Sequence, residues 1–549
     1  MSELDGIQLD VVVVGAGFAG LRNLHTLRER GLSVAVLEAG SDVGGVWFWN
    51  RYPGARCDVE SYDYSYSFSE ELEQEWRWSE RYATQPEILR YINHVADRFD
   101  LRRDVHLHQR MTRAVWDEAA GRWSVHTEAG ARWNARYLVM ATGQLSTTKN
   151  PELPGQEEFS GEIHHTARWP HEPVDFTGKR VGIIGTGSSG MQMIPIVAQQ
   201  AAHLTVFQRT PNFSVPATNA LLTDERDAAV KATYRERREA ARNSPSGLAF
   251  KPNRQSALDV SAQERQAHYE QAWTRLGFGF ALAYYDILRD QQANDTAADF
   301  IRAKIAHAVT DPATRETLTP RDFPFAAKRP SVDSGYFETF NRANVTLADI
   351  RADPIEAITP TGIRTGAEHH ELDLIVFATG FDALTGSLLR PEIVGCDGVT
   401  LREKWSGGPA TYLGLMVAGF PNMFIIAGPG SPSLLSNVLL STEQHVDWIA
   451  DLLTHVRAIG MTEVEATTEA EHGWVQHVNE RAQETLYPLA RFYYSGDEIP
   501  GKPRVFMPYV GGVRGYRRIL EQVVADGYEG FELRRSGADD LLDASGQGR

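Results

Sequence analysis

The stretch Val11-Val12-Val13-Val14-Gly15-Ala16-Gly17-Phe18-Ala19-Gly20 decides the fold of this chain. Four consecutive β-branched residues predict a strand that is buried on both faces, as in a parallel sheet. The glycines have the spacing of a dinucleotide-binding turn. Gly15 permits the tight turn, Gly17 lets a pyrophosphate approach the backbone, and Gly20 lets helix and strand pack closely. Residues 21–30 continue as a helix whose first N–H groups would face the phosphates.

The second strand of this unit is predicted at residues 34–37 and ends at Glu38. Glu38 lies 18 residues after Gly20, where an acid can accept hydrogen bonds from ribose hydroxyls. Because an acid at this place favours a free 2′-hydroxyl, the first site is expected to bind FAD or NAD.

A second unit of the same kind follows. Residues 179–184 predict another buried strand, which runs into Gly185-Thr186-Gly187-Ser188-Ser189-Gly190 and a helix. After the next strand, residues 204–207, Arg209 stands 19 residues beyond the last glycine and is followed by Thr210. An Arg at this place accommodates a 2′-phosphate, so the second site is expected to bind NADP.

Two later strands, residues 137–140 and 374–377, each end in Ala-Thr-Gly and should return the chain beside the first and the second site. The predicted fold class is therefore α/β, with two Rossmann-like dinucleotide-binding domains, for FAD and NADP, and an inserted helical region. The expected division is 1–145 and 378–533 for the FAD-binding domain, 146–222 and 326–377 for the NADP-binding domain, 223–325 for the helical insertion, and 534–549 for a disordered tail.

Local patterns add further elements. Residues 113–116 and 123–127 flank a turn and predict an antiparallel pair of strands, and residues 423–427 predict a later strand. Ser261-x-x-Glu264 and Ser441-x-x-Gln444 both have the form of a capping box, which predicts helices that begin at these two serines.

Composition excludes several classes of protein. The 549 residues carry a formal net charge of −17, so the basic footprint of a nucleic-acid-binding protein is missing and an anionic membrane surface would repel the chain. The polar start shows no signal peptide, and no apolar run is long enough to span a bilayer. Cys57 and Cys396 lack metal-ligand spacing and are expected as unpaired thiols in a reducing cytoplasm, where we place the protein.

The segment between the two glycine-rich units identifies a family. Phe159-x-Gly161-x-x-x-His165-x-x-x-Trp169-Pro170 matches the fingerprint of type I Baeyer–Villiger monooxygenases. The stretch Gly44-Gly45-x-Trp47 through Tyr52-Pro53-Gly54 to Asp58 matches a second motif of that family. The resemblance extends from about Val11 to Tyr528. Related flavin-containing and N-hydroxylating monooxygenases are similar but lack the Trp-Pro ending.

The resemblance implies a reaction. NADPH would reduce FAD, the reduced flavin would add O2 to form a peroxyflavin, and its attack on a ketone carbonyl would give an ester or lactone. The ketone is expected to be apolar and cyclic or bulky, with sulfoxidation as a side reaction. The chemistry needs a fixed cation that gives no proton away, a need that Arg meets better than Lys. The family's active-site Arg falls on Arg329, with Asp58 as its carboxylate partner.

The resemblance also implies binding residues. The cofactor-binding positions are Gly15, Gly17, Phe18, Ala19, Gly20, Glu38, Gly45, Val46, Trp47, Arg56, Cys57, Asp58, Tyr64, Met111, Gln144, Thr186, Gly187, Ser188, Ser189, Gly190, Gln192, Arg209, Thr210, Lys328, Val438 and Tyr493. Among them Lys328, Arg209 and Thr210 would clamp the 2′-phosphate. Leu434 and Leu435 are expected to border the substrate.

Two expectations concern motion and a departure from the family. His165 and Trp169 are expected to set the relative movement of the two domains rather than to act as acid or base. In the run from Phe492 to Lys502, Tyr493 stands where the family often has Trp, and Glu498 replaces Asn. This departure is expected to change the geometry of the cofactor lid and the rate of uncoupling. The protein is expected as a monomer or weak homo-oligomer.

Three other functions are weighed against this one. An N- or S-oxygenating flavin monooxygenase on the same scaffold would depend less on Arg329. A disulfide reductase needs a redox cysteine pair, which Cys57 and Cys396 do not form in sequence. A non-catalytic NADP-sensing flavoprotein would not require Arg329 and Asp58.

Overall fold

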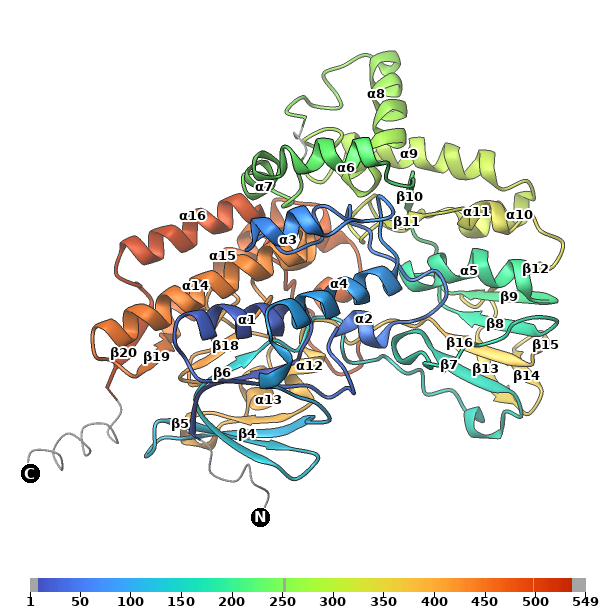
Figure 1. The fold of residues 1–549 in the computed structure, drawn as a ribbon. Helices are drawn as coiled ribbons and strands as arrows, with labels where there is room; N and C mark the ends of the chain where they lie inside the picture. Colours follow the sequence, from blue (N-terminus) through green and yellow to red (C-terminus); the bar gives the residue numbers. More distant parts are fainter. Residues whose placement is uncertain (1–7, 250–252, 497, 536–549) are drawn as a thin grey trace, which may run out of the picture.

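The computed structural model describes residues 8–249, 253–496 and 498–535 (Figure 1). Its first sheet is built from β1 (Gln8–Val14), β2 (Val34–Leu37), β3 (Val105–His106), β4 (Met111–Asp117), β5 (Arg122–Thr127), β6 (Arg132–Met140), β17 (Glu392–Val394) and β18 (Met423–Ile425). The spatial order is β17-β4-β5-β6-β1-β2-β3, with β18 paired beside β6. Strands β18, β6, β1, β2 and β3 run parallel, whereas β4, β5 and β6 form the predicted antiparallel excursion.

The second sheet is parallel throughout the described residues. Its strands are β7 (Glu162–His165), β8 (Arg180–Ile184), β9 (His203–Gln208), β12 (Val345–Asp349) and β16 (Leu374–Phe377), in the spatial order β12-β9-β8-β16-β7. Every strand of this sheet lies within 146–222 or 326–377, and every strand of the first sheet lies within 1–145 or 378–533.

The segment 159–170 is not only a connection between the two sheets. Its residues 162–165 form β7, the edge strand of the second sheet, where His165 stands opposite Phe377 of β16. Trp169 is buried in the same core as the helix that follows β8. The polar and aromatic composition concealed this strand, because an edge strand pairs on one side only and needs no continuous apolar run.

Helices cover both sheets (Figure 1). The longer ones are α1 (Phe18–Glu29), α4 (Gln85–Arg98), α5 (Ser188–Gln200), α14 (Val438–Ala458), α15 (Thr468–Gln483) and α16 (Gly512–Ala525), and the shorter ones are α2 (Val46–Trp49), α3 (Glu70–Glu75), α11 (Tyr336–Thr339), α12 (Gly386–Leu389) and α13 (Leu401–Lys404). Apolar side chains of α1 and α14 share one core with β1, including Leu24 and Ile449, which are fully buried.

The helical insertion forms the upper part of Figure 1. It comprises α6 (Asp224–Lys231), α7 (Tyr234–Arg242), α8 (Ala262–Arg275), α9 (Gln291–Ala308) and α10 (Pro312–Leu318). The predicted capping box is confirmed, because Ser261 Oγ accepts from the Glu264 N–H at 3.2 Å and the Glu264 side chain accepts in return from the Ser261 N–H. Smaller sheets are β10 (Ser214–Pro216) with β11 (Ser331–Asp333), β13 (Ile355–Thr359) with β14 (Gly362–Thr365) and β15 (His369–Glu371), and β19 (Glu463–Ala466) with β20 (Phe531–Arg534).

Two boundaries differ from expectation. The predicted cap at Ser441 is wrong: α14 begins at Val438, and the Asn437 side chain caps it by accepting from the Leu439 N–H at 3.2 Å. Strand β18 ends at Ile425, because Ala427 has φ +58°, which no strand accommodates. Arg534, the first residue of the expected tail, belongs to β20, and positions 536–549 lie outside the described residues.

No helix in the described part of the chain combines the length and the apolar character that crossing a membrane would need.

Candidate active site

The first glycine-rich loop has the geometry that its sequence predicted. Gly15 has φ +103°, and a Cβ there would lie 2.7 Å from the carbonyl oxygen of Ala141. A Cβ on Gly20 would lie only 1.7 Å from the carbonyl oxygen of Gly15. Gly17 is the N-cap of α1 and gives it no side-chain cap. The first-turn N–H groups, which begin at Phe18 and Ala19, therefore remain available to a phosphate.

Glu38 directly follows β2, beside this loop. Its Oε2 accepts from the Ala16 N–H and its Oε1 from the Gly40 N–H, each at 2.7 Å. Burial raises the pKa of the Glu38 carboxyl, although these two N–H groups oppose the shift. A carboxylate oxygen has a further lone pair after one such bond, so Glu38 can hold the turn and still accept from a ribose hydroxyl.

The second glycine-rich loop repeats the first. Gly185 has φ +109°, and a Cβ there would lie 2.4 Å from the Ala378 carbonyl oxygen, while a Cβ on Gly190 would lie 2.2 Å from the Gly185 carbonyl oxygen. Gly187 differs, since a Cβ on it would meet no atom within 4 Å. Helix α5 also lacks a side-chain cap at Gly187. The open space above an uncapped helix end fits a phosphate group.

The residues expected around Gly187 occupy this end of the second sheet. Thr186 is buried, and Ser188 and Ser189 open α5. Ser188 Oγ lies 3.2 Å from Ser331 Oγ of β11, so the loop is tied to the strand that follows Arg329.

Arg209 and Lys328 differ in their surroundings. Arg209 follows the last residue of β9, is exposed, and has neither hydrogen bond nor ion pair to the described residues, whereas Thr210 is half-buried. Lys328 Nζ lies 4.4 Å from the centroid of the Phe323 ring, a cation–π contact. Arg209 thus offers an exposed cation at the end of the strand where a 2′-phosphate would be recognised.

Asp58 and Arg329 form an ion pair between segments that are 271 positions apart. Arg329 Nε donates to Asp58 Oδ2 at 2.9 Å, and Nη2 lies 2.8 Å from the same oxygen in the ion pair. Arg329 Nη1 donates to the Leu434 carbonyl oxygen at 3.1 Å. The side chains are 18% and 24% exposed for Arg329 and Asp58. Burial lowers the pKa of the guanidinium, but the Asp58 carboxylate together with the nearby Tyr493 and Tyr494 raises it above its ordinary value.

Aromatic side chains from the C-terminal part of the chain surround this pair. Tyr487, Tyr493 and Tyr494 lie in two short 3-10 helices, η7 (Tyr487–Leu489) and η8 (Tyr493–Ser495). Burial raises the pKa of all three phenols, to about 12 for Tyr487, and the positive charge of Arg329 opposes the shift in each. Leu434 is buried in the same apolar cluster, and Leu435 packs against it.

Of these three tyrosines, only Tyr493 was predicted from the sequence as a site residue, and Tyr487 and Tyr494 were not. Five aromatic residues between 487 and 506 were the available signal. It could not be interpreted without the fold, because an aromatic run is as common in a core as at a site.

Most residues expected to line the first cofactor lie together. Trp47 Nε1 donates to Tyr64 OH at 3.1 Å, and the Phe18 and Tyr64 rings are 5.3 Å apart. Gln144 Nε2 donates to the Ala427 carbonyl oxygen at 2.7 Å. The other expected positions are Gly45, which has φ +55° and would bring a Cβ to 2.9 Å from Gly17 Cα, Val46 at the start of α2, the buried Met111 at the start of β4, and Val438 at the start of α14.

Arg56 and Gln192 join the two halves of the structure. Gln192 of α5 accepts from Tyr52 OH at 2.8 Å and donates to the Arg56 carbonyl oxygen at 3.1 Å. The Arg56 side chain pairs with Glu80 at 3.1 Å. Cys57, which follows, is buried, and both Cys57 and Cys396 are free thiols. The side chains of Arg56 and Gln192 therefore both have partners within the protein. Their contacts hold residues 52–56 against α5.

His165 is the last residue of β7 and directly precedes a short 3-10 helix. Its Nδ1 accepts from the Ala167 N–H at 3.0 Å, which starts the 3-10 helix η3 (Thr166–Arg168), and its Nε2 lies 3.4 Å from Thr379 Oγ1. Burial lowers the pKa of the imidazole. A neutral His165 therefore connects the segment 159–170 to the Ala-Thr-Gly return that follows β16.

Similarity to known proteins agrees with this geometry. Residues 12–273 match a family model described as pyridine nucleotide-disulphide oxidoreductase. A Baeyer-Villiger monooxygenase of Pseudooceanicola batsensis is 46% identical over 528 residues, which cover 95% of this chain and 96% of that protein. A phenazine N-monooxygenase, PhzNO1, of Lysobacter antibioticus is 42% identical over 539 residues, covering 97% of this chain and 98% of that protein.

Solved structures are equally similar. An oxidized steroid monooxygenase bound to NADP is 54% identical, with a TM-score of 0.93, and the match covers 96% of this chain and 100% of that one. The OTEMO complex with FAD and NADP is 40% identical, with a TM-score of 0.93 and coverage of 96% and 99%.

Proposed function

The chain belongs to the type I Baeyer–Villiger monooxygenases, and we propose how its residues carry out the reaction of that family. The protein is an FAD- and NADPH-dependent monooxygenase that inserts one oxygen atom of O2 next to a ketone carbonyl and forms an ester or lactone. The reduced flavin supplies the activated oxygen. The protein's own residues bind the two nucleotides, hold the charge and position the ketone.

The two glycine-rich loops divide the cofactors. The loop of Gly15 and Gly17 would hold FAD, with Glu38 accepting from its ribose. The loop of Gly187 would hold NADPH, with Arg209 recognising the 2′-phosphate. The uncapped starts of α1 and α5 and the open space above Gly187 support this assignment.

Arg329 is the catalytic cation. A guanidinium keeps its proton at any working pH, so it stabilises negative charge on the reacting oxygen without protonating it. Asp58 Oδ2 accepts from Nε and lies in ion-pair contact with Nη2, and the Leu434 carbonyl accepts from Nη1, so contacts at all three nitrogens fix the plane of the guanidinium. This pair is the observation that carries the proposal.

The ketone is apolar and bulky or cyclic. Leu434 and Leu435 belong to an apolar cluster that also contains Tyr487, Phe492 and Tyr493, beside the guanidinium of Arg329. A steroid monooxygenase is among the most similar solved structures, which supports a large ketone. Acyclic, monocyclic and polycyclic ketones should be compared by ester formed per NADPH consumed, with the highest yield for cyclic substrates.

Oxygenation at nitrogen or sulfur is the second candidate, because one relative is named as a phenazine N-monooxygenase. Attack by a soft nitrogen or sulfur nucleophile needs no negative charge to be held, so it would depend less on Arg329. Sulfoxidation is expected as a side reaction. A purified yellow protein that converts phenazine but no ketone would reverse this order.

The remaining roles concern assembly and motion. His165 and Trp169 support the movement of the FAD-binding and NADP-binding domains relative to each other. The protein is a monomer or weak homo-oligomer. Size-exclusion chromatography with light scattering tests the assembly.

A further inference from the structure

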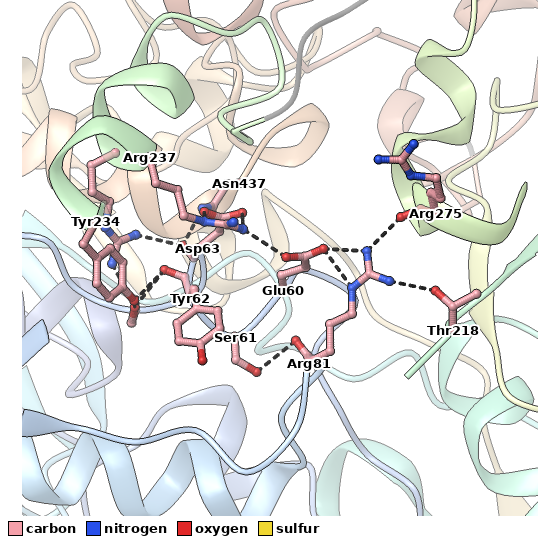
Figure 2. Close-up of polar contacts among 12 residues, drawn as sticks. Glu60, Ser61, Tyr62, Asp63, Arg81, Thr218, Tyr234, Arg237, Arg275 and Asn437 are labelled. Carbon is pink, nitrogen blue, oxygen red and sulfur yellow. Dashed lines mark hydrogen bonds and ion pairs between the residues drawn. The ribbon is translucent and has the colours of Figure 1, made fainter. Parts of the chain in front are cut away.

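Four charged side chains meet where three parts of the chain come together (Figure 2). Glu60 Oε1 accepts from Nε and Nη2 of Arg81 at 2.8 and 2.6 Å, and Glu60 Oε2 accepts from Nη2 of Arg237 at 3.0 Å. Arg237 also donates from Nε and Nη2 to the two oxygens of Asp63 at 2.8 and 2.7 Å. Two cations thus balance two carboxylates in one connected network.

The network links the helical insertion to the first cofactor unit. Arg237 lies on α7 of the insertion. Arg81 donates in addition to Thr218 Oγ1 and to the carbonyl oxygen of Arg275, the last residue of α8, both at 2.8 Å (Figure 2). The Asn437 side chain, which caps α14, donates to the Asp63 carbonyl oxygen at 2.7 Å.

Asp58 lies on the loop that this network holds. Residues 55–69 contain no helix or strand beyond a single bridge at Arg56. The backbone is fastened on both sides of Asp58, because the Cys57 N–H donates to the Ala83 carbonyl at 3.1 Å and the Ser61 N–H to the Arg81 carbonyl at 2.8 Å. Glu60 is only two residues after Asp58, so a shift of Glu60 carries Asp58 with it.

The charges of the network are strongly coupled. Asp63 is 4% exposed and Arg81 is 14% exposed, so water screens them little. Burial raises the pKa of Glu60, but the guanidinium groups of Arg81 and Arg237 outweigh this effect and hold it below its ordinary value. Glu60 therefore remains ionised around neutral pH, and removing one member of the network leaves a charge without its partner.

We propose that Arg237 of the helical insertion is a positioning residue for oxygen insertion. With Arg81 it fixes Glu60 and Asp63, and through them the loop that places Asp58 against Arg329. This role rests on the function proposed for Asp58 and Arg329, and it gives the helical insertion a part in the reaction. A displacement of a catalytic group by about 1 Å can cost roughly 100-fold in rate.

The test compares Arg237→Met with Arg235→Met in the full-length holoenzyme. Arg235 lies on the same helix but is exposed and outside the network, so it is a matched control. The readouts are bound flavin, NADPH consumption, and the shares of ester and hydrogen peroxide formed per NADPH. Arg237→Met should retain flavin but lose roughly tenfold or more of its ester yield, with peroxide replacing ester. Arg235→Met should match the wild type.

A double variant separates positioning from general weakening of the fold. If Arg237 acts through Asp58, adding Arg237→Met to Asp58→Asn should lower the ester yield no further, because the two changes remove the same arrangement. Multiplied losses, or an unchanged ester yield in Arg237→Met, would overturn the role. If Arg237→Met fails to bind flavin, Arg237→Lys keeps the charge without the forked contact and should give an intermediate yield. A wild type that forms no ester would instead defeat the proposed function.

Discussion

Arg329 directs two of its nitrogens, Nε at 2.9 Å and Nη2 at 2.8 Å, to the same oxygen of Asp58. One carboxylate oxygen therefore sets the orientation of the guanidinium, while the Leu434 carbonyl holds the third nitrogen. The arrangement leaves a cation fixed in direction and unable to give up its proton, which suits the stabilisation of an anionic oxygen.

Replacing Arg329 tests this cation directly. Arg329→Ala should bind flavin normally but lower the rate of ester formation by roughly 100- to 1000-fold or more, as loss of a preorganised donor does. Arg329→Lys should remain strongly impaired, because an ammonium group cannot form the same forked contact. Ester is measured by gas chromatography. Arg321→Ala, which removes an exposed ion pair with Glu316, is the control, and equal ester formation in both variants would refute the assignment.

Arg209 should decide between NADPH and NADH. Because a charged hydrogen bond contributes about 1.5–3 kcal/mol, Arg209→Ala should raise the KM for NADPH by roughly 10- to 100-fold. The KM for NADH should stay nearly constant, since NADH has no 2′-phosphate. Steady-state kinetics with both nucleotides provide the measurement, with the exposed Arg342→Ala as control. Parallel changes for the two nucleotides would exclude recognition of the phosphate.

The buried carboxyl of Asp333 should make the free energy of unfolding of the protein depend on pH. Burial raises the pKa of its carboxyl to about 6, with a smaller contribution from the Glu338 charge, although the Tyr336 N–H opposes the shift. The protonated form therefore adds stability that is fully present below pH 3.8 and is lost as the pH rises through about 6.

Asp333→Asn removes this titration and keeps the shape of the side chain. At pH 8 the variant should be more stable than the wild type by about 1–3 kcal/mol, since one pKa unit corresponds to about 1.4 kcal/mol. At pH 4 the advantage should be nearly absent. Melting temperatures followed by flavin fluorescence at both pH values measure this, and a gain that is the same at pH 4 and pH 8 would contradict the shifted pKa.

Lys502 anchors the C-terminal segment that carries Tyr493. Its ammonium forms an ion pair with Asp382 and donates to Thr385 Oγ1 at 2.9 Å, just beyond the second Ala-Thr-Gly return. Lys502→Met should loosen the segment, so a larger share of NADPH should end as hydrogen peroxide while flavin content stays the same. Peroxide is measured with a peroxidase assay, and Asp382→Asn should reproduce the effect. No rise in either variant would show that the anchor does not support coupling.

The two dinucleotide-binding units could be predicted from the amino-acid sequence alone. Gly15, Gly20, Gly185 and Gly190 occupy places where a Cβ would collide with backbone, so their spacing encodes the turn directly. Val11 to Val14 of β1 and Val181 to Ile184 of β8 are buried, as these apolar runs predicted. These features are local, because a strand, its turn and the next helix are set by neighbours along the chain.

The active-site geometry and several element boundaries depend on how the chain packs in three dimensions and could not be predicted from the sequence. The predicted cap at Ser441 was wrong because the Asn437 side chain caps α14, whereas Ser441 Oγ is hydrogen-bonded to Ser436 Oγ at 2.9 Å. The family resemblance paired Asp58 with Arg329, but which atoms meet, the Leu434 carbonyl and the link from Glu60 to Arg237 came from the folded chain alone. Contacts between residues hundreds of positions apart depend on how the sheets and the helical insertion pack, and sequence spacing carries no distance of that kind.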